Sequence, residues 1–325
     1  MSKEDGGSWP TAQDFDKGDG DMEIRAGKHK KHKDNLIGYL FMAPVLLGFF
    51  AFIAFPVIAS LLISFTDWNF LAGFSGIKFV GFANYAKLLS GNDAWFTPSF
   101  INTIIFTVTT VPIGLALGLI IAAFMDKYVY WSKLFRVFVF IPYIASVVAS
   151  VIVWQVMLQP TYGPVNSLLH SIGMANPPKW FVDPNWALPT IIIFQIWQTL
   201  GYNVIVFMAG LKGISADLYE AAEIDGAGEV RKFFSITLPM ISPTMFFLST
   251  MGIIGSFKVF DSISVATGGG PGTATSVVAF YIYREAFQMY RLGTANAAAW
   301  IMFAVIFVVT MIQLRGQNRW VTYES

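Results

Sequence analysis

Two runs of polar and aromatic side chains, set in apolar stretches, are the residues of this chain with the clearest capacity for chemistry. One run has the spacing i, i+3, i+4 and i+7 and comprises Gln195, Gln198, Thr199 and Tyr202. The other has the spacing i, i+3, i+7 and i+11 and comprises Tyr143, Ser146, Ser150 and Trp154. Each spacing places its members on one face of an α-helix. Amides and hydroxyls hydrogen-bond to hydroxyl groups and aromatic rings stack on ring faces, so both faces suit a polyhydroxylated solute.

The same residues could instead hold neighbouring helices together, and the sequence leaves both interpretations open. Ser, Thr and Gln side chains join packed membrane helices by hydrogen bonds of modest energy. The run from Gln195 to Tyr202 favours binding, because polar side chains within apolar spans are costly and mark pathways. A weaker stripe, formed by Gly252, Ser256 and Phe260, adds Ser256 to the candidate binding residues.

Catalytic and metal-binding chemistry has little support in this sequence. There is no cysteine, and the three histidines have no metal-ligand spacing. No Asp, Glu, Lys or Arg lies at the centre of an apolar stretch, whereas a proton-coupled carrier usually needs a buried carboxylate or histidine relay. We therefore expect no enzymatic activity, no cofactor and no bound metal, and a neutral substrate in preference to an ion.

Six apolar stretches must position these side chains. Of the 325 residues, 55% are hydrophobic and 13% are charged, whereas about 25% are charged in a typical soluble domain. A helix needs roughly 20 residues to cross a bilayer, and all six stretches qualify, the last two at the short end. They cover 36–65, 100–125, 134–158, 187–211, 241–257 and 297–314. The predicted fold is an all-α membrane protein with six transmembrane helices over 35–325, preceded by a disordered polar tail at 1–34.

The distribution of Lys and Arg predicts the orientation of these helices. Cytoplasmic loops of membrane proteins carry an excess of both residues. With the tail in the cytoplasm, thirteen Lys and Arg near the spans lie on that side and six on the other. An even number of spans returns the chain to its starting side, so both termini are predicted to be cytoplasmic.

The loop at 212–239, between the fourth and fifth stretches, is predicted to form two helices joined by a turn. Ser215 is placed to cap the first helix, and Gly226 to end it in a left-handed conformation. The second helix is expected to end before Pro239, where the next span begins. The apolar side of the first helix consists of Leu218, Ala221, Ala222 and Ile224. Nothing obvious in the sequence covers this side, which indicates docking into the groove of a partner.

This loop resembles the EAA loop of ABC importer permeases. Glu-Ala-Ala at 220–222, Gly226, and Ile-Thr-Leu-Pro at 236–239 match that pattern at its spacing. In that family the loop docks in a cleft on an ATPase subunit and transmits nucleotide-driven closure to the pore. The resemblance implies an ATPase-coupling role for Glu220, Ala221, Ala222, Gly226, Ile236, Leu238 and Pro239.

The resemblance is narrower still, to the carbohydrate-uptake branch that includes maltose-, multiple-sugar- and glycerol-phosphate-type permeases. It extends from about residue 36 to the end of the chain and rests on Ile141-Pro142-Tyr143, Asp225-Gly226-Ala227, Gly269-Gly270-Pro271, Tyr281-Ile282-Tyr283 and Ala286-Phe287. It implies the type I ABC importer permease fold and half of a pathway for uptake of a sugar or oligosaccharide. It also implies a place in the bacterial plasma (inner) membrane.

The resemblance further implies a set of partners. The glycines at 268–272 are not followed by Lys-Ser or Lys-Thr, so they do not form a P-loop, and separate subunits must hydrolyse ATP. The expected partners are a second homologous permease, two cytoplasmic ABC ATPases, an extracellular or periplasmic solute-binding protein, the sugar and membrane lipid, but no nucleic acid.

Three alternatives to this interpretation each predict a distinct pattern in the sequence. An ABC permease for another solute, such as glycerol phosphate or an amino acid, predicts an intramembrane counter-charge for an ionic substrate. An ion-coupled secondary carrier predicts inverted repeats with broken helices at corresponding positions. An intramembrane enzyme needs a cluster of reactive side chains within the spans. The sequence contains none of these three patterns.

Overall fold

The structure is a computed structural model that describes residues 39–128 and 132–321. The described residues divide into two compact parts, 39–60 and 61–321. The predicted polar tail at 1–34 lies outside the described residues. The first part is helical and contains a π-helical turn, η1 (Phe50–Ala54), before α2 (Phe55–Ser64). Pro56 is the second residue after this turn, and its missing N–H is compatible with a local departure from α-helical hydrogen bonding.

The second part is also mainly helical. Its long helices are α4 (Phe96–Tyr128), α8 (Pro184–Leu211) and α15 (Leu292–Trp320). The helices of intermediate length are α5 (Ser132–Ile144), α6 (Val147–Met157) and α12 (Ser242–Phe257). The connecting elements are β1 (Thr66–Asp67), η2 (Phe70–Ala72), η3 (Phe74–Gly76), β2 (Lys78–Phe79), α3 (Ala83–Leu89), α7 (Pro164–Ser171), η4 (Trp180–Val182), α9 (Ala216–Ile224), α10 (Glu229–Lys232), η5 (Phe233–Thr237), α11 (Leu238–Met240), α13 (Asp261–Ala266), α14 (Val278–Tyr283) and η6 (Arg284–Gln288). The two strands pair antiparallel, with Thr66 opposite Phe79.

The described residues contain six candidate membrane spans, in agreement with the six that the sequence predicts. Four are unbroken helices, Tyr39–Ser64, Phe96–Met125, Pro184–Leu211 and Leu292–Gln317. Two are bent helix pairs, Leu134–Ile144 with Val147–Met157 and Glu229–Met240 with Ser242–Phe257, each counted as one span. The last span has 26 residues, longer than predicted, because it begins within the loop at Leu292.

The third span is not the single continuous helix that the predicted stripe requires. Its two arms, α5 and α6, meet at 95°. Ser146, between them, has a ψ of 125°, which is not helical. Helical phase is kept only along an unbroken helix, so Tyr143 on α5 and Ser150 on α6 do not share one helical face. The prediction of a single stripe from Tyr143 through Ser146 and Ser150 to Trp154 is wrong for this reason.

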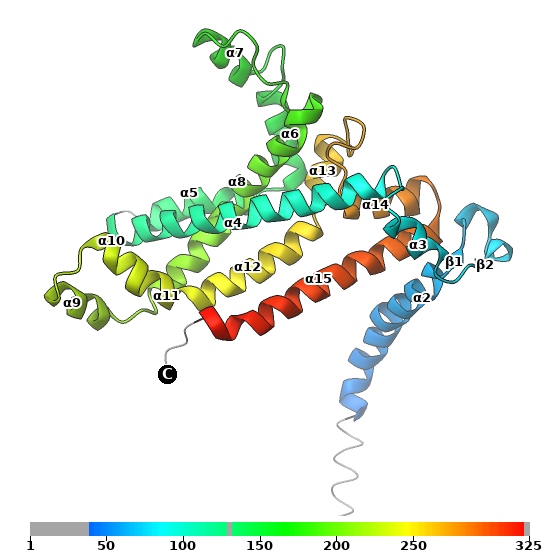
Figure 1. The fold of residues 1–325 in the computed structure, drawn as a ribbon, viewed down its shortest axis with the longest axis horizontal. Coiled ribbons are helices and arrows are strands. Elements are labelled where there is room, and N and C mark those ends of the chain that lie inside the picture. Colours follow the sequence, from blue (N-terminus) through cyan, green and yellow to red (C-terminus); the bar gives the residue numbers. More distant parts are fainter. Residues whose placement is uncertain (1–38, 129–131, 322–325) are drawn as a thin grey trace, which may run out of the picture. The chain divides into compact units, whose positions relative to one another are not determined.

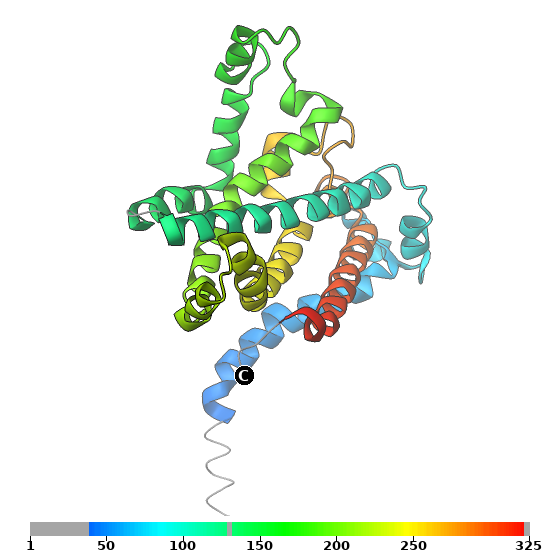
Figure 2. The same ribbon diagram turned by 60° about the vertical axis from the view of Figure 1, so that its left-hand side comes forward.

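Two glycines allow α4 and α8 to pack closely. A Cβ atom at Gly118 would lie 2.8 Å from Cβ of Asn203, and one at Gly114 would lie 3.4 Å from Asn203 Nδ2. Gly114 and Gly118 form the small-xxx-small spacing by which membrane helices approach each other. α12 packs on both α4 and α15 (Figure 1). The helices α7 and α9 lie toward opposite ends of α8 (Figure 2).

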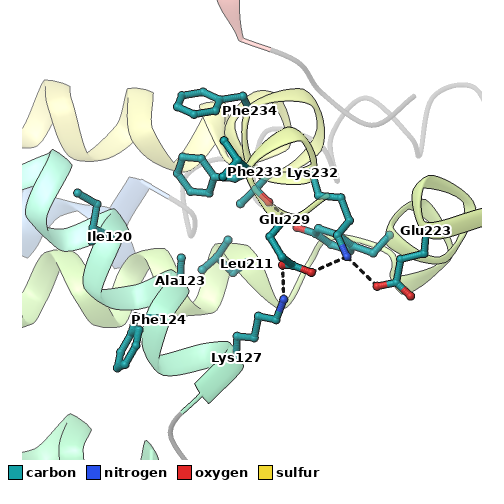
Figure 3. A pocket seen from close by; sticks show the side chains of 13 residues that line it. Ile120, Ala123, Phe124, Lys127, Leu211, Glu223, Glu229, Lys232, Phe233 and Phe234 are labelled. Atoms are coloured by element: carbon teal, nitrogen blue, oxygen red, sulfur yellow. Dashed lines mark hydrogen bonds and ion pairs between the residues drawn. The ribbon is translucent and has the colours of Figure 1, made fainter. Parts of the chain in front are cut away.

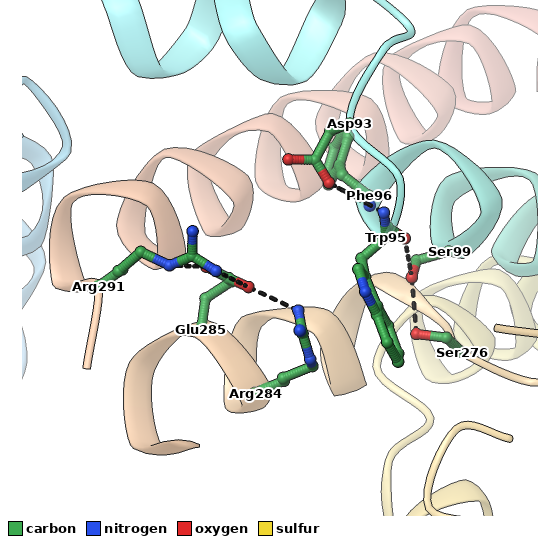
Figure 4. Close-up of polar contacts among 8 residues, drawn as sticks. All are labelled: Asp93, Trp95, Phe96, Ser99, Ser276, Arg284, Glu285 and Arg291. Carbon is green, nitrogen blue, oxygen red and sulfur yellow. Dashed lines mark hydrogen bonds and ion pairs between the residues drawn. The ribbon is translucent and has the colours of Figure 1, made fainter. Parts of the chain in front are cut away.

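Three charged residues are packed together near the beginning of α4, in what we call the Glu285 cluster: Glu285, Arg284 and Arg291 (Figure 4). The Glu285 side chain is 2% exposed and lies 2.8 Å from Arg284 Nη1 and 2.8 Å from Arg291 Nε. The Arg284 guanidinium also lies over the Trp95 ring, 3.9 Å from its centre. Burial raises the pKa of the Glu285 carboxyl, and the guanidinium groups of Arg291 and Arg284 oppose that rise.

The Glu285 cluster holds together segments that are far apart in the sequence. The backbone N–H of Arg291 donates to Glu285 O at 2.8 Å, and that of Leu292 donates to Trp68 O at 2.9 Å. The cluster therefore fixes the beginning of α15 against η6 and against the segment that follows β1.

Candidate functional site

We call residues 212–239 the coupling loop, and its first helix, α9, begins and ends as the sequence predicts. The Ser215 hydroxyl caps the helix by accepting a hydrogen bond from Asp217 N. Gly226 has a φ of +73°, in the left-handed region. Its N–H donates to Glu223 O at 3.0 Å, and Ala227 N–H donates to Ala222 O at 2.9 Å. This pair of bonds is a Schellman motif, which satisfies the last carbonyls of α9.

The residues of the EAA pattern occupy two different environments. No residue of α9 is buried, and Glu220 and Ala221 are exposed, as are the apolar Leu218 and Ile224. Leu238, in contrast, packs against an apolar cluster that contains Leu211 and Ile241. The first half of the pattern is thus free for contact with another molecule, while the second half joins the loop to the helix bundle.

The end of the second loop helix differs from the prediction. Helical structure continues from Glu229 through η5 and α11 to Met240, with Pro239 inside it rather than after it. Pro239 is the second residue of α11, which directly follows the π-helical turn η5, and this local departure from α-helical hydrogen bonding accommodates its missing N–H. The direction changes at Ile241, where this arm meets α12 at 63°.

Four charged residues tie the coupling loop to α4, and we call them the coupling network: Lys127, Glu229, Lys232 and Glu223 (Figure 3). Lys127, in the last turn of α4, pairs with Glu229. Lys232 pairs with Glu229 at 2.9 Å and with Glu223, on α9, at 2.7 Å. Glu229 is therefore shared between two ammonium groups, one at the end of α4 and one in its own helix, α10.

A further hydrogen bond links α9 to the next span. The hydroxyl groups of Tyr219, on α9, and Thr237, on η5, are 2.9 Å apart. This bond connects α9 directly to the arm that leads into α12, and the coupling network connects α9 to the end of α4 through Lys232 and Glu229. A displacement of α9 therefore has a short physical route to both helices.

A cavity of about 400 Å³ lies between α4, α5, α8 and α12. Five of the predicted binding residues line it: Tyr143, Gln195, Thr199, Tyr202 and Ser256. The rings of Tyr143 and Tyr202 stack with their centres 4.9 Å apart and their planes at 20°. Among the described residues that line this cavity, none has a formal charge.

The structure separates the other three predicted binding residues from this cavity. Gln198 is buried, with 5% of its surface exposed, and it does not line the cavity although Gln195 and Thr199, on the same helix, do. Ser146 lies at the break between α5 and α6. Ser150 is buried on α6. The four residues of the fourth-span run therefore split into three that line the cavity and one that does not.

Two of the lining hydroxyls already have protein partners. The Ser256 hydroxyl donates to Thr107 Oγ1 on α4 at 2.9 Å. The Thr199 hydroxyl donates to Gln195 O at 2.9 Å. Both the binding and the helix-packing interpretations of these two residues are consistent with this geometry.

Sequence reasoning missed several residues of the site. Thr110 and Asn203 line the cavity, and Asn203 lies against the two glycines of α4. The spacing of Gly114 and Gly118 is the signal that could have located this close approach. The pairing of Lys127 with Glu229, 102 residues apart, has no local sequence signal.

The chain is similar in sequence to proteins that are named as transport permeases. A model of the family described as "Binding-protein-dependent transport system inner membrane component" matches residues 114–323. The probable ABC transporter permease protein YesP of Bacillus subtilis is 33% identical over 90% of this chain and 94% of its own length. The sulfoquinovosyl glycerol transport system permease protein SmoG of Agrobacterium fabrum is 33% identical over 87% of this chain and 90% of its own length.

A solved structure shares the fold. A chain of a bacterial alginate ABC transporter, crystallised in complex with an alginate pentasaccharide-bound periplasmic protein, matches with a TM-score of 0.76. It is 25% identical and covers 89% of this chain and 96% of its own length. The fold, the loop and these relatives agree, and the chain belongs to the family of binding-protein-dependent transport system inner membrane components, the permease subunits of ABC importers.

Proposed function

We propose that this permease forms half of the transmembrane pathway for an uncharged sugar or oligosaccharide. The observation that carries the proposal is the cavity between α4, α5, α8 and α12, with its stacked Tyr143–Tyr202 pair and the Gln195 amide and without charged lining. Its volume, about 400 Å³, is within the roughly 300–1,000 Å³ of small-molecule sites. The carbohydrate-related names of SmoG and of the alginate importer support a carbohydrate substrate. Alginate and sulfoquinovosyl glycerol are both acidic, so the uncharged character of the proposed substrate rests on the cavity lining alone.

The coupling loop supports the second half of the proposal, which concerns energy. In this interpretation α9 docks with its exposed face, including Glu220 and Ala221, on a cytoplasmic ABC ATPase. Closure of two such ATPases on ATP pulls the loop, and the Tyr219–Thr237 bond and the coupling network transmit the movement to α12 and α4. The permease itself catalyses no covalent step in this scheme.

The other partners follow from the same scheme. A second, homologous permease completes the pathway, and a solute-binding protein delivers the sugar on the side opposite the coupling loop. The excess of Lys and Arg on the side of the coupling loop supports placing that side, with both termini, in the cytoplasm.

Reconstitution tests the proposal. The chain would be co-purified from its native membrane with its associated subunits, placed in nanodiscs, and assayed for ATP hydrolysis with its binding protein. The assay would compare neutral oligosaccharides, acidic oligosaccharides, glycerol phosphate and amino acids. We expect an associated ATPase whose hydrolysis rate rises with a neutral oligosaccharide.

Stimulation by glycerol phosphate or an amino acid alone would replace the substrate class and keep the ABC mechanism. Uptake that needs an ion gradient and no ATPase would remove the coupling role of the loop.

A further inference from the structure

A second, larger cavity lies where the coupling loop meets the end of α4. Its volume is about 740 Å³. Apolar side chains from three segments line it: Ile120, Ala123 and Phe124 from α4, Leu211 from the end of α8, and Val230, Phe233 and Phe234 from the coupling loop (Figure 3). This cavity is separate from the one proposed to carry the sugar, since the two share no lining residue.

An exposed apolar stripe on α4 leads into this larger cavity. Ile113, Leu117, Ile120 and Phe124 are all exposed and follow one another at i, i+4, i+7 and i+11, on one face of the helix. They belong to a candidate membrane span that ends at Met125. An exposed apolar face of a membrane-spanning helix is suited to contact lipid chains, so the surface that faces lipid continues directly into the cavity.

The rim of the cavity carries charges of both signs in equal number. The four residues of the coupling network border it, with two ammonium groups and two carboxylates. Figure 3 shows these charged groups gathered on one side of the cavity and the phenylalanine rings of the coupling loop on another. Lys127 follows the end of the span by two residues, at the depth where phospholipid head groups lie.

We propose that this cavity is a phospholipid site, with one acyl chain among the apolar residues and a zwitterionic head group at the coupling network. A head group that carries both an ammonium and a phosphate, as phosphatidylethanolamine does, matches a rim that carries both signs. The bound lipid contacts α4 and the coupling loop at once. If the proposed coupling function holds, the lipid also stabilises the loop against α4 during ATP-driven movement.

Photocrosslinking locates the lipid directly. The full chain, alone and in its complete importer, would be placed in nanodiscs of phosphatidylethanolamine and phosphatidylglycerol that contain phosphatidylethanolamine with a diazirine on its acyl chain. After illumination, peptide mass spectrometry would map the label. We expect label on the segments 120–124 and 230–234 in both preparations.

A matched pair of variants identifies the site. Ala123→Trp fills the cavity, whereas Ala116→Trp introduces the same ring at an exposed position of α4 that does not line it. Ala123→Trp is expected to lose most of the label from both segments, and Ala116→Trp to retain it. Label distributed evenly along α4, or retained in Ala123→Trp, would overturn the proposal.

The same experiment separates the lipid from a protein occupant. Label present in the isolated chain but lost in the complete importer would assign the cavity to the second permease and overturn the lipid site. Label retained in an importer that shows no ATP-driven uptake would leave the lipid site in place and refute the proposed function instead.

Discussion

Two groups of charges lie at opposite ends of α4 and differ in their surroundings. The helix has 33 residues, which corresponds to about 50 Å at about 1.5 Å per residue. At its beginning, the Glu285 carboxylate is enclosed between two arginines with 2% of its side chain exposed. At its end, Lys127 and Glu229 are 46% and 58% exposed. One end of the helix is therefore fixed by a buried carboxylate. The other end is linked to the loop by the Lys127–Glu229 pair, which water reaches, although Lys232 in the same network is buried.

This difference matters because burial changes what an ion pair contributes. Removing one partner of a buried pair leaves an uncompensated charge without water, whereas exposed pairs contribute little and are screened by salt. Buried pairs therefore hold a structure in one arrangement, and exposed pairs can exchange partners at low cost. The assignment of the rigid end to the Glu285 cluster and of the movable end to the coupling loop follows from this contrast.

The largest expected effect is at the buried end. Glu285→Leu leaves Arg284 and Arg291 without their shared carboxylate and is expected to lower the free energy of unfolding by about 3–5 kcal/mol. Thermal unfolding of the purified chain, followed by loss of the monodisperse peak in size-exclusion chromatography, measures this change. Glu229→Leu is the matched control and is expected to leave the unfolding temperature nearly unchanged. Equal losses in the two variants would remove the contrast between the two ends.

The second prediction concerns the turn that ends α9. Gly226→Ala places a Cβ at a φ of +73°, which costs roughly 1–2 kcal/mol and disfavours the Schellman motif. Gly228→Ala is the control, because that residue has a φ of −71° and added Cβ atoms meet nothing within 4 Å at either glycine. We expect Gly226→Ala to lower sugar uptake per ATP hydrolysed, in a reconstituted importer, and Gly228→Ala to leave it unchanged. The same ratio in both variants would mean that the geometry of this turn does not matter for coupling.

The local features of this loop were predictable because they depend on neighbouring residues. A serine before a helix and a glycine after it have strong conformational preferences, and Ser215 and Gly226 follow them. The six spans were predictable for a similar reason, since apolar length alone identifies them. The bend at Ser146 was not, because no residue there forbids an α-helix and the break depends on packing against other helices.

The candidate pathway was predictable in part. Helical spacing correctly grouped Gln195, Thr199 and Tyr202 on one face of α8. It could not show which edge of that face neighbouring helices cover. Gln198 is buried and lies on the covered edge. The contribution of α4 was missed although Thr103, Thr107 and Thr110 fall at i, i+4 and i+7, a spacing that could have indicated a polar face. Pairings between distant segments, such as Lys127 with Glu229, require the tertiary structure.

The third prediction uses this split within the fourth-span run. Gln195→Leu removes an amide that lines the cavity. Because one net hydrogen bond contributes roughly 0.5–1.5 kcal/mol, the apparent affinity for the sugar, measured by its stimulation of ATP hydrolysis, is expected to fall by up to about tenfold. Gln198→Leu, on the same helix but outside the cavity lining, is expected to change the apparent sugar affinity little. Titration of sugar against hydrolysis rate compares the two. A larger change in apparent affinity for Gln198→Leu would move the pathway to the other face of α8.

The smallest expected effect is that of salt, and it separates the two ends of α4 without any mutation. Raising the ionic strength from about 0.1 M to about 1 M shortens the screening length from about 10 Å to about 3 Å. This change weakens the exposed Lys127–Glu229 pair of the coupling network and leaves the enclosed Glu285 cluster largely unaffected. We expect a modest fall in uptake per ATP hydrolysed, measured in the reconstituted importer, with no change in the unfolding temperature.

The reverse outcome would contradict the comparison of the two ends. A lower unfolding temperature at high salt, with unchanged uptake per ATP hydrolysed, would reverse the assignment of the rigid and movable ends of α4.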